Sequence, residues 1–194
     1  MITREQAWKL LTEKMQNQNL RKHCYAVEAV MGALYDRLNV EKKDEERERW
    51  KIAGLLHDAD YEVTKETAKT DHTKKILEWL RLFDVHSDVT SAIASHAWGY
   101  LENAPEPVTP MQWALYTCDE LTGLIVATAL VKPDKKLASV TVESVMKKWN
   151  SPSFAAGVDR RQIELCSERL GIPLSEFIEI ALTAMQGISG YLGL

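Results

Sequence analysis

The feature that most constrains this chain is the adjacent pair His57-Asp58, which directly follows two leucines. Histidine and aspartate both bind metal ions, and a position at the end of an apolar run directs such side chains toward a core. Four further residues of these types lie on the predicted apolar faces of other helices. They are His23, His72, His96 and Asp119. Six candidate ligands on five helices predict an all-α fold with a two-metal site in its core.

Nearly every segment carries apolar residues at helical spacing. Candidate helix starts, each marked by a capping residue or a capping box, are Thr3 with Gln6, Asn19, Asp71, Ser87, and Thr109 with Pro110. The expected helices cover about 3–15, 50–57, 71–83, 87–96, 109–122, 140–149, 159–170 and 175–192, with another beginning at 19. Residues 41–48 suggest a charged bend, and 138–142 show a weak strand alternation.

The aspartates strengthen the metal interpretation. Asp119 shares an apolar stripe with Met111 and Leu115, and no lysine or arginine lies within a helical turn of it. A buried carboxylate without a partner is very costly, so a metal ion is the economical solution. The same argument holds for Asp58, which follows Leu55 and Leu56. Imidazole together with carboxylate suits first-row divalent metals such as iron, manganese, cobalt, nickel or zinc.

The ordered set of a histidine, a His-Asp pair, two histidines and an aspartate resembles the HD superfamily of metal-dependent phosphohydrolases, over about residues 19–130. The resemblance implies an all-α HD-domain helical bundle with additional C-terminal helices. The minimal family pattern matches His23, His57, Asp58 and Asp119, which would hold one metal. The six-ligand pattern of the binuclear branch adds His72 and His96, which would hold a second metal, with Asp58 as the bridge.

Within that branch the chain is similar to bacterial symmetrical dinucleoside tetraphosphatases, with two departures. Ala59-Asp60 follow the His-Asp pair, where many relatives have Ile-Gly or Ile-Ala. Glu120 to Gly123 follow Asp119 without the nearby arginine of those enzymes. Both departures lie beside the ligands and therefore concern the substrate. An HD-fold di-iron oxygenase of inositol shares the same ligand order, so this order leaves the reaction open.

The resemblance implies hydrolysis of a phosphate ester or anhydride of a nucleotide-like substrate, by a hydroxide that bridges two divalent metals such as iron or manganese. Asp58 would be catalytic as the bridge. Asp60 could orient water or the leaving group, or could cap a helix. The alternatives are a di-iron oxygenase and a metal-stabilised helical binding module without catalysis. The sequence identifies no substrate-binding residue.

Composition sets the remaining expectations. The 194 residues suit a single domain, 1–194, with a metal-binding core at about 19–130 and a helical extension at about 131–194. A net charge of −4 makes nucleic acid an improbable partner, while basic residues after Pro133 favour a small anionic, phosphate-containing substrate. No apolar run approaches the roughly 18 residues that span a bilayer, and no signal segment begins the chain, so we expect a cytoplasmic protein. The three cysteines fit small buried thiols, and the oligomeric state stays open.

Overall fold

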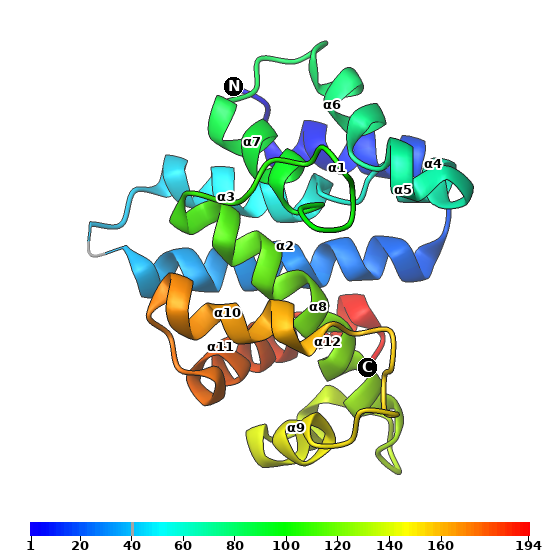
Figure 1. The fold of residues 1–194 in the computed structure, drawn as a ribbon, viewed down its shortest axis with the longest axis vertical. Helices are drawn as coiled ribbons and strands as arrows, with labels where there is room; N and C mark the ends of the chain where they lie inside the picture. Colours follow the sequence, from blue (N-terminus) through cyan, green and yellow to red (C-terminus); the bar gives the residue numbers. More distant parts are fainter. Residues whose placement is uncertain (40) are drawn as a thin grey trace.

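The computed structural model describes residues 1–39 and 41–194, which form helices joined by turns and loops (Figure 1). The helices of eight or more residues are α1 (Arg4–Lys14), α2 (Gln18–Leu38), α3 (Asp44–Leu56), α7 (Ser87–Ser95), α8 (Pro110–Leu130), α9 (Val142–Trp149), α10 (Arg160–Leu170) and α11 (Leu174–Gly187). The shorter ones are α4 (Tyr61–Thr64), α5 (Ala68–Asp71), α6 (Lys74–Leu80) and α12 (Ser189–Leu192). Over the described residues there is no β-strand, which confirms the all-α prediction.

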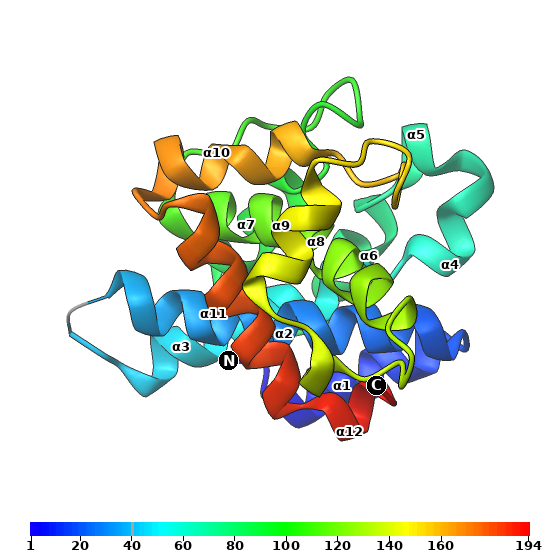
Figure 2. The ribbon, with the colours of Figure 1, turned by 90° about the horizontal axis from the view of Figure 1, so that it is seen from below.

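Helix α2 is the centre of the molecule. It crosses the fold between α3 on one side and α11 on the other, and α8 runs across it (Figures 1 and 2). The stripe predicted with His23 is the buried face of α2, where Val27, Val30 and Leu34 are fully buried. α2 and α3 approach closely at Gly54, where an added Cβ would lie only 2.9 Å from the carbonyl oxygen of Val27. The absence of a side chain on Gly54 therefore sets the spacing of the two helices that carry His23 and His57.

Two helices begin at residues other than those predicted. Asn17, not Asn19, caps α2, because its Oδ1 accepts hydrogen bonds from the backbone of residues 19 and 20. Helix α3 begins at Asp44, inside the segment predicted as a charged bend. Its first turn carries three acidic residues, which the positive end of the helix dipole stabilises. Thr109 and Pro110 begin α8 as predicted, with a complete capping box.

The predicted helix over 71–83 is the largest error. Asp71 ends the short helix α5, and α6 begins only at Lys74. Between them Thr73 takes a left-handed backbone conformation, with φ of 68°, which interrupts the helix. A β-branched residue is rarely found there. His72 therefore lies in a junction between two short helices, and its position depends on what holds that junction.

The C-terminal part is helical as predicted, except that residues 138–142 form no strand. A short 3₁₀ turn at Leu137–Ser139 leads into the cap of α9 instead. Gly171, with φ of 66°, ends α10. Side chains from all the described α-helices except α4 and α5 belong to one buried hydrophobic cluster, which supports the proposal of a single domain. None of the described helices has the length and apolar character needed to cross a membrane.

A partly buried ion pair fastens α1 to α2. The guanidinium of Arg4 donates to both carboxylate oxygens of Glu28, at 2.6 and 2.9 Å. The Glu28 side chain is 7% exposed, whereas that of Arg4 is 46% exposed. Removing Arg4 therefore leaves a carboxylate that water cannot readily reach.

We predict that Arg4→Ala lowers the free energy of unfolding by about 2 kcal/mol, between the values typical of exposed and buried pairs. Urea denaturation followed by circular dichroism measures the change. Lys9→Ala, at an exposed position of the same helix, is the control and should cost less than about 0.5 kcal/mol. Equal losses for the two variants would show that the ion pair contributes nothing specific.

Candidate metal centre

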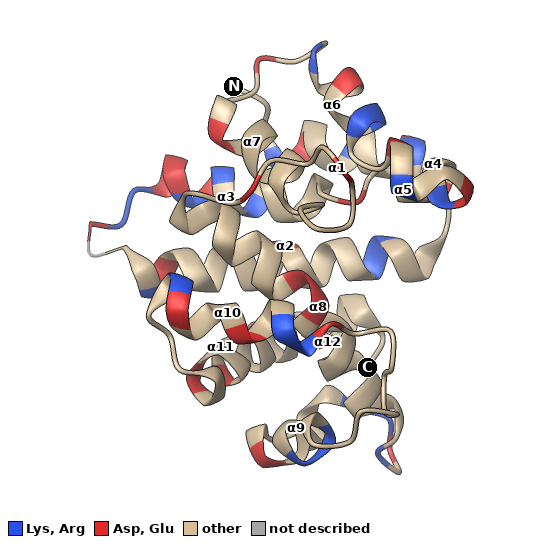
Figure 3. Cartoon of the chain, in the orientation of Figure 1, with Lys and Arg blue, Asp and Glu red and all other residues tan. Residues whose placement is uncertain are grey.

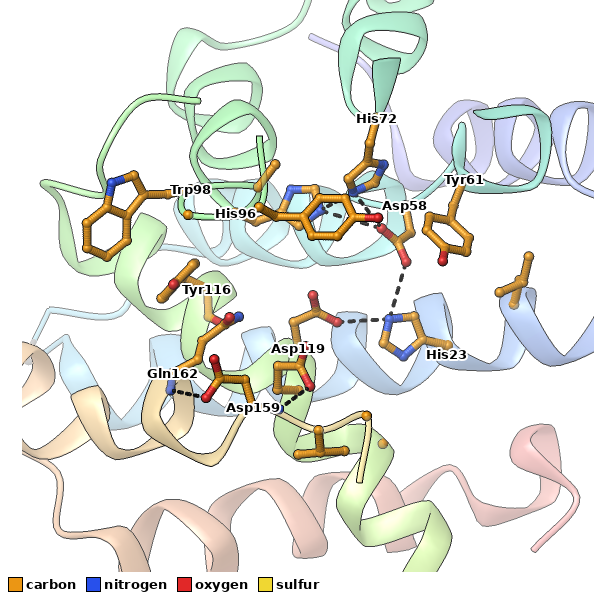
Figure 4. Close-up of a pocket in the computed structure, with 18 residues that line it drawn as sticks. His23, Asp58, Tyr61, His72, His96, Trp98, Tyr116, Asp119, Asp159 and Gln162 are labelled. Carbon is orange, nitrogen blue, oxygen red and sulfur yellow. Dashed lines mark hydrogen bonds and ion pairs between the residues drawn. The ribbon is translucent and has the colours of Figure 1, made fainter. Parts of the chain in front are cut away.

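The six predicted ligands come together from five separate segments. His23 lies on α2, His57 and Asp58 directly follow α3, and Asp119 lies midway along α8. His72 occupies the junction between α5 and α6, and His96 is the C-cap residue that follows α7. Figure 4 shows His23, Asp58, His72, His96 and Asp119 facing a common space. The ligand atoms of His23, His57 and Asp119 lie within 4.8 Å of one another, and so do those of His57, Asp58 and His96.

The outer nitrogen of each of the four histidines is already occupied. His57 Nδ1 donates to the carbonyl of Gly54 at 2.8 Å, and His96 Nδ1 donates to that of Ile93 at 2.6 Å. His72 Nδ1 donates to the Asp60 carboxylate at 3.1 Å. The Thr122 hydroxyl donates to Asp119 O, so its oxygen accepts from His23 Nδ1 at 3.2 Å.

These bonds fix the tautomer of each neutral ring, so that every Nε2 carries a lone pair. The Nε2 atoms face one another in two pairs. His23 and His57 have their Nε2 atoms 3.1 Å apart, and His72 and His96 have theirs 3.0 Å apart. Lone pairs held so close repel unless a cation lies near them. Nitrogen and carboxylate donors of this kind suit first-row divalent metals, so the donor set fits the expected cofactor.

Asp58 stands between the two histidine pairs. Its Oδ1 lies 3.2 Å from His72 Nε2 and 3.5 Å from His96 Nε2. Its Oδ2 lies 3.6 Å from His23 Nε2 and 3.7 Å from His57 Nε2. Asp119 Oδ1 joins the second group, 2.9 Å from His23 Nε2. One carboxylate thus presents an oxygen to each pair, which is the arrangement of a bridging ligand.

Charge in the centre favours a cation. Burial lowers the pKa of His57, but Asp58 and Asp119 outweigh it and raise that pKa to about 9. Burial likewise lowers the pKa of His72, and Asp58 and Asp60 raise it to about 10. Burial raises the pKa of both Asp58 and Asp119, yet the surrounding histidines bring each well below its usual range. The two carboxylates therefore stay ionised and stabilise positive charge at the Nε2 atoms, which protons supply unless a metal displaces them.

The structure gives Asp60 a place that differs from the one expected of a catalytic group. Its side chain is fully buried and lies outside the cavity described below. Its Oδ1 accepts from His72, and its Oδ2 accepts from the backbone of Lys75 and Ile76 at 3.0 and 3.1 Å. Asp60 thereby caps α6 from a distance and orients His72. We propose a positioning role for it in place of the catalytic one.

We predict that Asp60→Asn weakens metal binding at the His72–His96 pair by about 10- to 100-fold. The amide of asparagine can still cap α6, but its NH₂ group would face His72 Nδ1 and favour the other tautomer, with the proton on Nε2. The metal content of the purified protein and a Mn²⁺ titration measure the effect. Asp71→Asn, a half-exposed neighbour, is the control. Unchanged affinity in Asp60→Asn would show that this carboxylate does not set the histidine's tautomer.

A cavity of about 660 Å³ opens onto the centre. Tyr61, Trp98, Tyr100 and Tyr116 contribute aromatic surface to it. Among the described residues that line it, none is a lysine or an arginine. The basic residues after Pro133 favour an anionic substrate in the sequence, but none of them is among the described residues that line this cavity. Lys148, for example, lies over the ring of Phe154.

We call Tyr116, Glu120, Asp159 and Gln162, which line one side of the cavity, the distal wall. Figure 4 labels all of them except Glu120, the one member that the sequence analysis had singled out. Glu120 follows a ligand in sequence, and Asp119 and Glu120 are the only charged residues of α8, seen as red in Figure 3. Burial, and then the charge of Asp119, raise the pKa of Glu120 to about 7. Asp159 and Gln162 reach the cavity because α10 packs on α8, and no local sequence pattern predicts that packing.

Arg160 builds the loop that leads into this wall. Its guanidinium donates to the carbonyls of Phe154 at 2.7 Å, Trp149 at 3.0 Å and Ser151 at 3.3 Å. The loop between α9 and α10 thus folds around a single side chain. The loop thereby brings residues 157–159 to the lining of the cavity, so the C-terminal extension contributes to the site.

Comparison with known families agrees with the geometry. Residues 20–124 match the HD domain. No curated protein sequence matches the chain closely enough to be compared with it. The matched region spans more than half of the chain and contains His23, His57, Asp58, His72, His96 and Asp119. This chain, with its buried cluster of histidines and aspartates, therefore belongs to the HD domain family, a superfamily of metal-dependent phosphohydrolases.

Proposed function

We propose that the protein is a phosphohydrolase with two divalent cations, acting on a small phosphate-containing, nucleotide-like substrate. The observation that carries this proposal is the arrangement around Asp58. Four Nε2 lone pairs, fixed by four Nδ1 hydrogen bonds, face the two oxygens of one carboxylate. A merely structural metal site would not require two such pairs beside an open cavity of about 660 Å³.

His23, His57 and Asp119 would hold one cation together with Asp58 Oδ2, and His72 and His96 would hold the other together with Asp58 Oδ1. Two such cations supply a nucleophile at neutral pH and stabilise the charge that develops on phosphate oxygens. The residues of the chain would orient these groups. Asp58 lies between the two groups of ligands and sets the distance between them. Asp60 and Thr122 hydrogen-bond to His72 and His23 and thereby fix the orientation of these two rings. Tyr61 lies against His72, with ring centroids 5.6 Å apart, and forms part of the aromatic surface on which a flat group can rest.

The test is phosphate release from a panel of nucleotides and simple phosphate esters, with Mn²⁺ or Fe²⁺, in air and under anaerobic conditions. We expect release that depends on the metal and is independent of oxygen. Oxygen consumption coupled to substrate loss would instead indicate the di-iron oxygenase. Binding of metal without turnover of any compound would favour the non-catalytic module. His96→Ala should abolish release, whereas Lys9→Ala, at an exposed position of α1 outside the centre, should leave it unchanged.

A further inference from the structure

The distal wall offers hydrogen-bond acceptors to the cavity. Gln162 Nε2 donates to the carbonyl of Tyr116 at 2.6 Å, so the amide oxygen of Gln162 remains as an acceptor. Glu120 Oε2 accepts from the backbone N–H of Asp159 at 3.0 Å, and no donor from the described residues reaches its Oε1. Asp159 uses Oδ1 to cap α10, accepting from Arg161 at 2.9 Å and from Gln162 at 3.4 Å. Acceptors therefore predominate at this end of the cavity.

The charge of the cavity likewise makes the distal wall unsuited to an anionic group. Because no lysine or arginine is found among its described lining residues, positive charge for a substrate's phosphate can come only from the metal end. Two divalent cations would offset Asp58 and Asp119 and leave charge for one phosphate group. Glu120 and Asp159 would repel any further phosphate that reached the distal wall. A chain of phosphates is thus unfavourable in this cavity, in contrast to the tetraphosphate substrates of the similar enzymes.

Aromatic side chains lie beside the acceptors of the distal wall. The rings of Trp98 and Tyr116 lie 5.5 Å apart between centroids, beside the acceptors of the distal wall. Aromatic faces attract flat rings and cations, and carboxylates attract N–H donors. The two features together describe the part of the substrate that lies away from its phosphate.

We propose that the substrate is a phosphate monoester bearing a nitrogen group rich in N–H donors, and that Glu120 is the residue that selects it. The inference rests on the proposed function. The shared chemistry, an amino group accepted by a carboxylate, could come from a nucleobase or from an aliphatic amine. In either case the ester would lie with its phosphate at the metal end and its amino group at the distal wall.

The test measures binding, so that it does not depend on turnover. The ligands are phosphonates, whose C–P bond resists hydrolysis, titrated calorimetrically into Mn²⁺-loaded protein without oxygen. One pair is the adenosine phosphonate and its purine riboside counterpart without the amino group; the other is 3-aminopropylphosphonate and propylphosphonate. We expect the amine-bearing member of at least one pair to bind about 10- to 100-fold more tightly. Which pair shows the preference identifies the source of the amine.

Glu120→Gln keeps the shape and the acceptor for Asp159 but removes the charge, and it should abolish most of that preference. Glu164→Gln removes one charge from an exposed position of α10 and should leave the preference intact. Any of four results would overturn the inference. They are equal binding within both pairs, a preference that survives in Glu120→Gln, tighter binding of ATP than of AMP, and no binding of any phosphonate. If phosphonates bind with the expected preference but no ester releases phosphate, the proposed function fails, while the preference for amine-bearing ligands assigned to Glu120 stands.

Discussion

Asp58→Asn should lose metal-dependent activity by at least about 1,000-fold, because one carboxylate faces both histidine pairs. The amide has nearly the same shape but carries no charge and offers only one oxygen. One half of the centre therefore loses its oxygen ligand, and the other keeps only an uncharged oxygen. Activity with excess Mn²⁺, together with the metal content of the purified variant, measures the loss.

Stability gives a second readout of the same change. Metal that binds only the folded state stabilises it by about 2.7 kcal/mol at a concentration 100 times its dissociation constant. Wild-type protein should show this shift in thermal unfolding when Mn²⁺ is added or removed by a chelator, and Asp58→Asn should show little. Asp44→Asn, at an exposed position in the first turn of the same helix, is the control. Full metal content and activity in Asp58→Asn would refute the bridging role.

Gly54→Ala should lower the free energy of unfolding by about 2 kcal/mol, although alanine is the better helix former by up to about 1 kcal/mol. The new Cβ would lie 2.9 Å from Val27 O and 3.0 Å from two backbone atoms of Glu28. These are backbone atoms, so relief requires α2 and α3 to move apart. His57, whose Nδ1 donates to Gly54 O, would move with α3 and weaken metal binding as well.

Gly187→Ala is the matched control. It also lies in a helix, but an added Cβ there meets nothing within 4 Å. Its stability should stay the same or rise slightly, since only helix propensity changes. Urea denaturation of both variants, with and without Mn²⁺, separates the packing effect from the metal effect. If Gly54→Ala is as stable as Gly187→Ala, the close approach of the two helices does not limit the fold.

The sequence predicts the parts of the structure that depend on local spacing. The stripe of His23, Val27, Val30 and Leu34 becomes the buried face of α2 because the pattern and the helix share one period. The capping box at Thr109 fixes the start of α8 within a single turn. Helical periodicity also places His23 and Asp119 toward the common space, whereas His72 reaches it from an irregular junction that the periodicity does not predict. Their roles as ligands remain predictions.

The errors lie where distant segments decide the conformation. Asp60 has two equally reasonable roles in the sequence, and only its contacts 12 to 16 residues away distinguish them. The same contacts explain why α6 begins at Lys74 and why Thr73 accepts a left-handed conformation. The rest of the distal wall was missed for a related reason. Nothing near Gln162 in sequence indicates that its amide donates to Tyr116, 46 residues earlier.

The loop folded around Arg160 has a consequence for how such a chain can diversify. The predicted metal ligands all lie within residues 20–124, whereas Asp159 and Gln162 follow this loop, beyond the matched region. Asp159 and Gln162 bond to Glu120 and Tyr116 of α8, so an exchanged loop must keep these two contacts to leave Asp119 in place. Under the proposed function, the residues for the reaction and those for the choice of substrate therefore lie in separate stretches of the sequence. We expect that replacing residues 150–158 with another chain's loop would change the specificity and leave the predicted ligands in place.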